Sequence, residues 1–316
     1  MIIVERYTPA MEREWNDLVS TSRNATFLHD RRYMDYHADR FADYSLVARD
    51  AHGVMLAVLP ACRAGVVVTS HAGLTYGGWL MPERRCDALD MLEIWDAMTD
   101  LLRAEGVSTL IYKPVPHIYH RRPAEEDIYA MARAGGQLDS CLVSSVIDLD
   151  DPIPTDRGAR RHVNRVMNDP GVTLGESTSW EDFYGVLSRL LAERYDARPV
   201  HTLDELMLLR SRFERHIRLY AATDTATGEM LAGTVLYVTD RVARCQYIAA
   251  SPRGKDLSVM PALFQYLINE YRGVVRYLDM GSSNEDDWHE VNAGLLRQKC
   301  SYGGRAIAFP TFTLEL

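Results

Sequence analysis

The residues with the clearest chemical potential follow a strand predicted at 275–280. Asp279 lies at the carboxyl end of that strand, and Glu285 follows in the next loop. A carboxylate in such a place can bind an ammonium group or take its proton, directly or through water. Asp279 is the first candidate for amine binding or general-base chemistry, and Glu285 is the second; the alternative for Asp279 is a turn-stabilising carboxylate. Asp286 and Asp287 are interpreted as an acidic cap of a helix predicted at 288–299.

A second candidate site is the turn 251–258, with the sequence SPRGKDLS. It joins a strand predicted at 242–250 to a helix predicted at 257–272. The unpaired amides of a helix N-terminus, together with the charges of Arg253 and Lys255, suit a phosphate. The alternative is a solvated basic turn.

Four arginines, Arg157, Arg160, Arg161 and Arg165, lie within nine residues. One or two of them could hold a nucleotide diphosphate through bidentate contacts, and the alternative is a solvated helix face. The formal charge of the chain is −9. That balance disfavours a broad nucleic-acid surface, and no sustained heptad pattern predicts a helical arm, so we expect neither DNA nor tRNA as a partner.

Length and composition limit the remaining possibilities. The 316 residues, 47% hydrophobic and 25% charged, are typical of a globular protein of about two domains. The five cysteines are widely spaced and form no CxxC pair, so we expect free thiols, no disulfide framework and no metal site. No apolar run is long enough for a signal peptide or a membrane span, and we expect a cytoplasmic protein. The sequence does not indicate an oligomeric state.

The predicted elements alternate in the same order in both halves of the chain, β-α-α-β-β-β-α-β-α-β. Asp150–Pro154 contains two prolines and predicts the boundary between domains 1–150 and 151–316. In the first half the strands are predicted at 2–7, 44–49, 54–59, 65–70, 107–112 and 141–149, and the helices at 9–20, 30–38, 87–104 and 124–134. In the second half the strands are predicted at 171–175, 217–222, 230–239, 242–250, 275–280 and 305–314, and the helices at 179–195, 203–213, 257–272 and 288–299.

Both the element order and several motifs carry a resemblance to a known family. The motifs are HAGLTYGG at 71–78, IYH at 118–120, PAEED at 123–127, RPVHT at 198–202, QYIAAS at 246–251, DMGSSNE at 279–285, NAGL at 292–295, QK at 298–299 and GGRA at 303–306. With them the chain resembles the FemABX-like branch of the GNAT acyltransferases over nearly its whole length. The resemblance implies an α/β fold of two tandem GNAT-like domains, each with a mixed, mostly antiparallel sheet flanked by helices.

The same resemblance implies an activity. It indicates an N-acyltransferase that moves an acyl group from acyl-CoA directly to a primary amine, without a metal or a covalent enzyme intermediate. We expect the acceptor to be a nucleotide-linked amino sugar of surface-glycan or lipopolysaccharide synthesis. Two alternatives remain: a FemX-like ligase that uses aminoacyl-tRNA, and a tandem domain that binds a ligand without catalysis. The second alternative gains support from Ser258, which stands where the family pattern has a glycine.

The resemblance also implies binding residues. The acyl-CoA pyrophosphate would lie on the 251–258 turn, and a backbone N–H near Ala249 or Ala250 would bind the oxyanion. The expected donor-binding residues are Ala249, Ser251, Arg253, Gly254, Lys255, Leu257 and Ser258. The expected substrate-binding residues are Tyr76, Tyr119, Glu126, Arg161, Arg165, His201, Gln246, Tyr247, Ser283, Asn284, Asn292 and Lys299.

Overall fold

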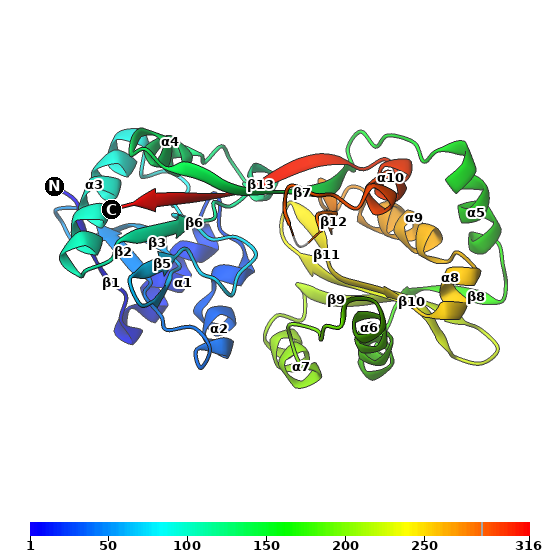
Figure 1. Cartoon of the computed structure of the whole chain (residues 1–316). Coiled ribbons are helices and arrows are strands. Elements are labelled where there is room, and N and C mark those ends of the chain that lie inside the picture. The colour runs from blue at the N-terminus through cyan, green and yellow to red at the C-terminus, as the bar shows by residue number, and fades with distance from the viewer. Residues whose placement is uncertain (286) are drawn as a thin grey trace. The chain divides into compact units, whose positions relative to one another are not determined.

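The computed structural model describes residues 1–285 and 287–316 (Figure 1). Asp286, interpreted above as part of an acidic cap, lies outside the described residues. The chain forms two compact units: unit 1 is Met1–Leu142 with Ala308–Leu316, and unit 2 is Val143–Ile307. The units divide within the long strands β7 (Gln137–Asp148) and β13 (Arg305–Glu315). Domain limits of 1–150 and 151–316 remain a proposal.

Unit 1 contains two sheets. Strands β1 (Ile3–Arg6), β2 (Leu46–Arg49) and β3 (Met55–Leu59) form an antiparallel sheet. In the second sheet β4 (Cys62–Ala64) pairs with β5 (Val67–Thr69), β5 runs parallel to β6 (Thr109–Tyr112), and β6 is antiparallel to β13. The strand expected at 65–70 is β5, and β4, which forms a short hairpin with it, is an additional strand. The helices are α1 (Glu12–Thr21), α2 (Arg31–Met34), α3 (Ala88–Ala104) and α4 (Glu126–Arg133), with 3-10 turns at Pro9–Met11, Phe27–His29, Asp35–His37 and His117–Tyr119.

The core of unit 1 forms on the apolar face of α3. Asp87 caps the helix by accepting hydrogen bonds from the amides of Leu89 and Asp90, and Gly106 follows its end with a positive φ of 73°. Met91, Ile94, Trp95, Met98 and Leu102 recur at helical spacing and are all buried. The cluster to which they belong includes Leu46, Leu59 and Leu110 from the strands, so α3 holds both sheets together.

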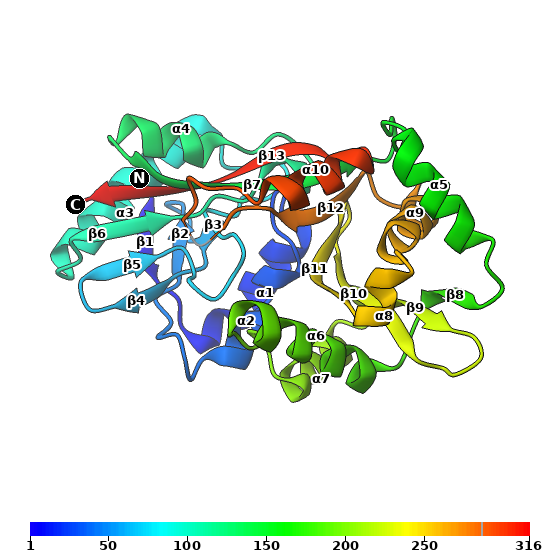
Figure 2. The ribbon, with the colours of Figure 1, turned by 45° about the vertical axis from the view of Figure 1, so that its right-hand side comes forward.

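Unit 2 is built on one mixed sheet. Its strands lie in the order β7, β12 (Tyr277–Ser282), β11 (Val242–Ala250), β10 (Met230–Val238), β9 (Ile217–Asp224) and β8 (Val172–Glu176). All neighbours are antiparallel except β11 and β12. The helices are α5 (Arg157–Met167), α6 (Trp180–Tyr195), α7 (Leu203–Arg212), α8 (Pro252–Asp256), α9 (Met260–Tyr271) and α10 (Ala293–Ser301). Helices α5 and α9 cover one face and α6 and α7 the other, which confirms the predicted mixed α/β architecture (Figures 1 and 2).

Several helix boundaries differ from the predictions. The helix expected at 257–272 is two helices, α8 and α9, which are separated where Ser258 has a positive φ of 56°. The helix expected from 288 begins at Ala293, so Asp287 cannot be its acidic cap and instead accepts a hydrogen bond from the amide of His289. Helix α7 begins with a capping box, because the Thr202 hydroxyl accepts from the Glu205 amide and the Glu205 carboxylate accepts from the Thr202 amide.

The last strand of each half lies in the sheet of the other half. In β7, Val146, Ile147 and Asp148 pair with β12 of unit 2. In β13, Phe312–Glu315 pair with β6 of unit 1. The repeat in element order is therefore accompanied by an exchange of the final strands.

Candidate functional site

The parallel strands β11 and β12 pair over a short length and then part. Val242, Ala243 and Arg244 pair with Tyr277, Leu278 and Asp279, and no later ladder pair joins the two strands in the described part of the chain. Strand β11 remains paired with β10 as far as Ala250. The stretch Cys245–Ala250 thus has a strand edge without a β12 partner. Backbone groups on such an edge can bind a ligand, and the expected oxyanion donors near Ala249 and Ala250 lie along it.

Asp279 lies at the point where the two strands part, and its side chain is fully buried. Its Oδ2 pairs with Arg244 Nη1 at 2.5 Å. Its Oδ1 accepts hydrogen bonds from the Ser144 hydroxyl and, at 2.8 Å, from the Gly281 amide. A buried carboxylate is stable only when paired and hydrogen-bonded in this way. The arrangement makes Asp279 a residue that positions Arg244 and the end of β12, and its predicted role as a base stays a prediction.

Lys299, on α10, contacts the end of β12. The residue is 4% exposed, and its Nζ donates to the carbonyl oxygens of Gly281 at 2.9 Å and Ser282 at 2.7 Å. Burial lowers the pKa of Lys299 to about 8, against smaller raising effects of Cys245 and Asp279. Asp279 and Lys299 were predicted from separate motifs. The structure thus brings them together at the end of β12, where both contact Gly281.

The other residues predicted near the end of β12 mainly form hydrogen bonds that hold the local backbone. The Asn284 side chain accepts from the Val143 amide and donates to the Trp288 carbonyl, both at 2.7 Å. Asn292 caps α10 by accepting from the Leu295 amide. Ser283 is buried, and its hydroxyl has no hydrogen-bond partner among the described residues. Glu285 is exposed, so it is the predicted carboxylate that solvent and substrate can reach.

His201 and Tyr247 are also brought together. The Tyr247 hydroxyl lies 2.6 Å from His201 Nδ1 and 3.3 Å from the His201 amide, which donates to it. These contacts fasten the segment before α7 to β11. Gln246, the neighbour of Tyr247 in the strand, is also partly buried. The structure therefore joins His201 to Tyr247, and the predicted role of Gln246 in binding stays a prediction.

Several amides of the 251–258 turn, where the phosphate site is expected, are used within the turn. The Gly254 amide donates to the Ser251 hydroxyl. The amides of Lys255, Leu257, Ser258 and Val259 donate to backbone carbonyls of the same segment, at 2.9–3.1 Å. The turn thus folds into α8 and offers these amides to no phosphate.

Packing and ion pairs fix the same turn further. A Cβ on Gly254 would lie 1.9 Å from the Leu231 carbonyl oxygen, so α8 rests directly on β10. Arg253 pairs with Asp224 and, at 2.7 Å, with Glu229. Ala249 is buried, and the Leu257 carbonyl accepts from Arg165 at 3.2 Å. Lys255, another of the expected donor-binding residues, is exposed.

In unit 1 the predicted tyrosines belong to the core. Tyr76 and Tyr119 are each 2% exposed, and their ring centroids lie 4.5 Å apart. Neither ring therefore offers a free face on which a sugar or base could stack.

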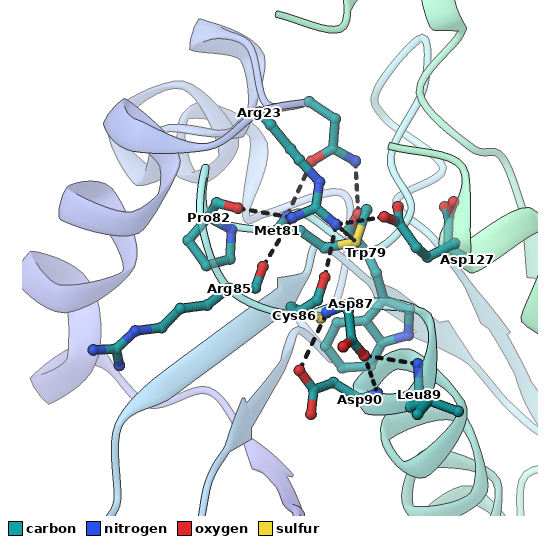
Figure 3. A network of polar contacts seen from close by, with 12 residues as sticks. Arg23, Trp79, Met81, Pro82, Arg85, Cys86, Asp87, Leu89, Asp90 and Asp127 are labelled. Carbon is teal, nitrogen blue, oxygen red and sulfur yellow. Dashed lines mark hydrogen bonds and ion pairs between the residues drawn. The ribbon is translucent and has the colours of Figure 1, made fainter. Parts of the chain in front are cut away.

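Glu126 lines a polar cavity of unit 1. The lining also includes Arg23, Arg85 and Cys86, which are labelled in Figure 3. The buried Arg23 guanidinium pairs with Glu126 Oε1 at 2.8 Å and donates to the carbonyl oxygens of Pro82, Arg85 and Cys86. Glu126 Oε2 is buried and has no hydrogen-bond partner among the described residues. Arg23 and Glu126 thus line this cavity, of about 960 Å³, as an ion pair.

Sequence reasoning missed Arg244, Ser144 and Arg23. No motif marks any of the three, and Arg244 meets Asp279 only through the parallel register of β11 and β12. In residues 1–285 and 287–316, no group of three or more His, Cys, Asp or Glu side chains is placed to hold a metal ion. Within the same ranges, every helix is too short or too polar to cross a membrane.

Comparison with known proteins agrees with this geometry. Residues 155–289 match the acetyltransferase (GNAT) domain family. No curated protein matches the sequence. The structure is similar to FemX at 11% identity and a TM-score of 0.70, covering 99% of this chain and 97% of FemX. It is also similar to the C-terminal domain of a putative lysylphosphatidylglycerol synthetase from Agrobacterium fabrum, at 13% identity and a TM-score of 0.60, covering 98% and 92%.

A third structure, a tandem GNAT protein from the clavulanic acid biosynthesis pathway, has 15% identity and a TM-score of 0.52, covering 100% of this chain and 98% of that protein. At these identities the solved structures establish the fold. Residues 155–289 thus match the acetyltransferase (GNAT) domain family, and the fold of the chain is similar to the folds of FemX and a tandem GNAT protein.

Proposed function

We propose that unit 2 transfers an aminoacyl group from aminoacyl-tRNA to a primary amine. The observation that carries this proposal is the closed 251–258 turn. An acyl-CoA needs free amides for its pyrophosphate, and the amides of Gly254 to Val259 that the structure describes as donors are engaged within the turn. An aminoacyl ester on the end of a tRNA has no pyrophosphate to hold. The resemblance to FemX-like ligases supports the same kind of donor.

The reaction would use the parting strands. The neutral amine attacks the ester carbonyl, and the amides along Cys245–Ala250 stabilise the oxyanion that forms. Glu285, the exposed carboxylate, accepts the proton that the amine loses. The ribose oxygen then leaves with the bonding electrons and takes up the proton that Glu285 accepted, directly or through water, so that the carboxylate is restored. Asp279 and Lys299 act as positioning residues, because their contacts fix the end of β12, which precedes Glu285.

Acyl-CoA-dependent acylation of a nucleotide-linked amino sugar is the second candidate. The match of residues 155–289 to an acetyltransferase family favours it. Under this candidate the donor's phosphates would have to bind side chains such as Lys255 rather than the amides of the turn.

A donor assay separates the two candidates. Purified protein is given either acetyl-CoA or bulk tRNA charged with radiolabelled amino acids, together with a panel of primary amines that includes a UDP-linked amino sugar. We expect label to move from tRNA to an amine. We expect the Glu285→Gln variant to show a larger factor of change in kcat, which falls, than in KM. Glu270→Gln, an exposed carboxylate on α9, is the matched control.

Thiol release from acetyl-CoA, without transfer from charged tRNA, would overturn the proposal in favour of the second candidate. Absence of both reactions over the whole amine panel would favour a binding role without catalysis. Equal losses in the Glu285 and Glu270 variants would remove Glu285 from the mechanism.

A further inference from the structure

Helix α5 presents one continuous basic face. Successive residues of an α-helix are turned by about 100°, so Arg157, Arg161 and Arg165 form one row along its surface. Val163 and Val166 lie on the opposite side and are buried against the unit. The three arginines are exposed, and the row extends over about 12 Å at 1.5 Å per residue.

This arrangement does not stabilise the helix itself. Arg157 occupies the first helical position, where the helix dipole disfavours a cation. Arg157 and Arg161, and Arg161 and Arg165, are like-charge pairs at four-residue spacing, each destabilising by about 0.2–0.5 kcal/mol. No acidic residue lies in Arg157–Met167, and no ion pair to these arginines occurs in the described part of the chain. Arg165 lies in the last turn, where the helix dipole favours a cation, and it also contacts Leu257, but Arg157 and Arg161 have no such role. Charges that the fold does not use indicate an external anion.

The row continues toward the 251–258 turn. Arg165 Nη2 donates to the Leu257 carbonyl at 3.2 Å, so the end of α5 lies against the segment that joins α8 to α9 (Figure 2). Lys255 on α8 is exposed and extends the positive charge beside β11. One or two arginines are enough for a nucleotide diphosphate, whereas charges spaced over about 12 Å suit a repeating polyanion.

We propose that the Arg157–Arg161–Arg165 row binds the sugar–phosphate backbone of an RNA. The RNA would be the aminoacyl-tRNA donor of the proposed function, and its identification as the donor rests on that proposal. The net charge of −9 disfavours RNA binding over the whole surface, but the row concentrates three uncompensated positive charges at one place in unit 2. The contacts are to phosphates, so the row would orient the RNA without reading its sequence.

The test uses the full chain and an unacylated RNA hairpin with a duplex stem and a single-stranded 3′ end. Affinity is measured by fluorescence anisotropy over a series of salt concentrations for the natural protein and for the variant R157Q/R161Q/R165Q. Three phosphate contacts contribute about 2 to the slope of log K against log salt, at about 0.7 per contact. We expect the variant to lose that contribution. Its melting temperature should stay equal or rise, because the like-charge pairs are gone.

The matched control is R13Q/R103Q/R133Q, which removes three exposed arginines of unit 1. An unchanged slope in the α5 variant, or an equal change in both variants, would overturn the proposal. Loss of acetyl-CoA binding with unchanged RNA binding would also overturn it, in favour of a small-nucleotide site. Because the hairpin carries no amino acid, its binding is independent of whether the donor assay detects transfer.

Discussion

Lys299 makes a quantitative prediction about stability and pH. The residue is 4% exposed, and burial lowers the pKa of Lys299 from its ordinary value of 10.5 to about 8. The two carbonyl contacts of the ammonium, to Gly281 and Ser282, do not restore the solvation that it loses. The folded state therefore binds this proton less tightly than the unfolded state does.

Proton linkage determines the direction and the size of the change in folding stability with pH. Below about pH 8 both states hold the proton, and stability does not change with pH through this group. Between pH 8 and 10.5 only the unfolded state holds it, so stability rises with pH. At 1.36 kcal/mol for each pKa unit, the full rise is about 3 kcal/mol, of which about 2 kcal/mol develops between pH 7 and pH 9.5.

The assay is urea unfolding at pH 7 and pH 9.5, with tryptophan fluorescence as the signal. The natural protein should gain about 2 kcal/mol more between the two pH values than Lys299→Met does. Lys113, whose pKa burial also lowers to about 8, is present in both proteins and cancels from the comparison. Lys255→Met, which removes an exposed lysine, should behave as the natural protein does. An equal pH response in the natural protein and Lys299→Met would refute the reasoning.

Two further predictions concern the packing around the same strands. Arg244→Met leaves the buried Asp279 carboxylate without its cation and should lower the free energy of unfolding by about 3–5 kcal/mol in urea titrations; a loss below 1 kcal/mol would mean that the pair is not formed. Gly254→Ala places a methyl group 1.9 Å from the Leu231 carbonyl oxygen and should lower the melting temperature. Gly185→Ala, in the middle of α6 with open space around its Cβ, should raise stability by up to about 1 kcal/mol, and equal effects of the two alanines would contradict the tight contact of α8 with β10.

The sequence predicted the sheets of unit 2 better than their connections. Strands β9, β10 and β11 lie where short apolar runs and turn residues place them, because periodicity and turn chemistry are local signals. The pairing of β13 with β6 joins residues about 200 positions apart. No local pattern specifies such a partner, so the exchange of final strands had no signal in the sequence.

In the candidate site, too, the sequence predicted residues that lie in motifs and missed contacts between distant residues. Asp279 and Lys299 were predicted from separate motifs, and the structure joins them at the end of β12. Arg244 was missed, because its role depends on register. The closed 251–258 turn was also unpredictable, since Arg253 is held by Asp224, a residue 29 positions earlier that carries no motif. The predicted roles of the remaining site residues stay predictions.

The exchange of final strands has a consequence for how the chain reaches its native state during synthesis. Strand β6 is made early, but its neighbour β13 is made about 200 residues later, so the β6 edge stays open while unit 2 is being completed. Apolar strands with open edges are the places where nascent chains aggregate, and contacts between distant residues form slowly. Cutting the chain between residues 150 and 151 would leave each fragment with a final strand whose partner is on the other fragment. The two halves, whose elements follow a similar order, therefore each need the other to complete their sheets.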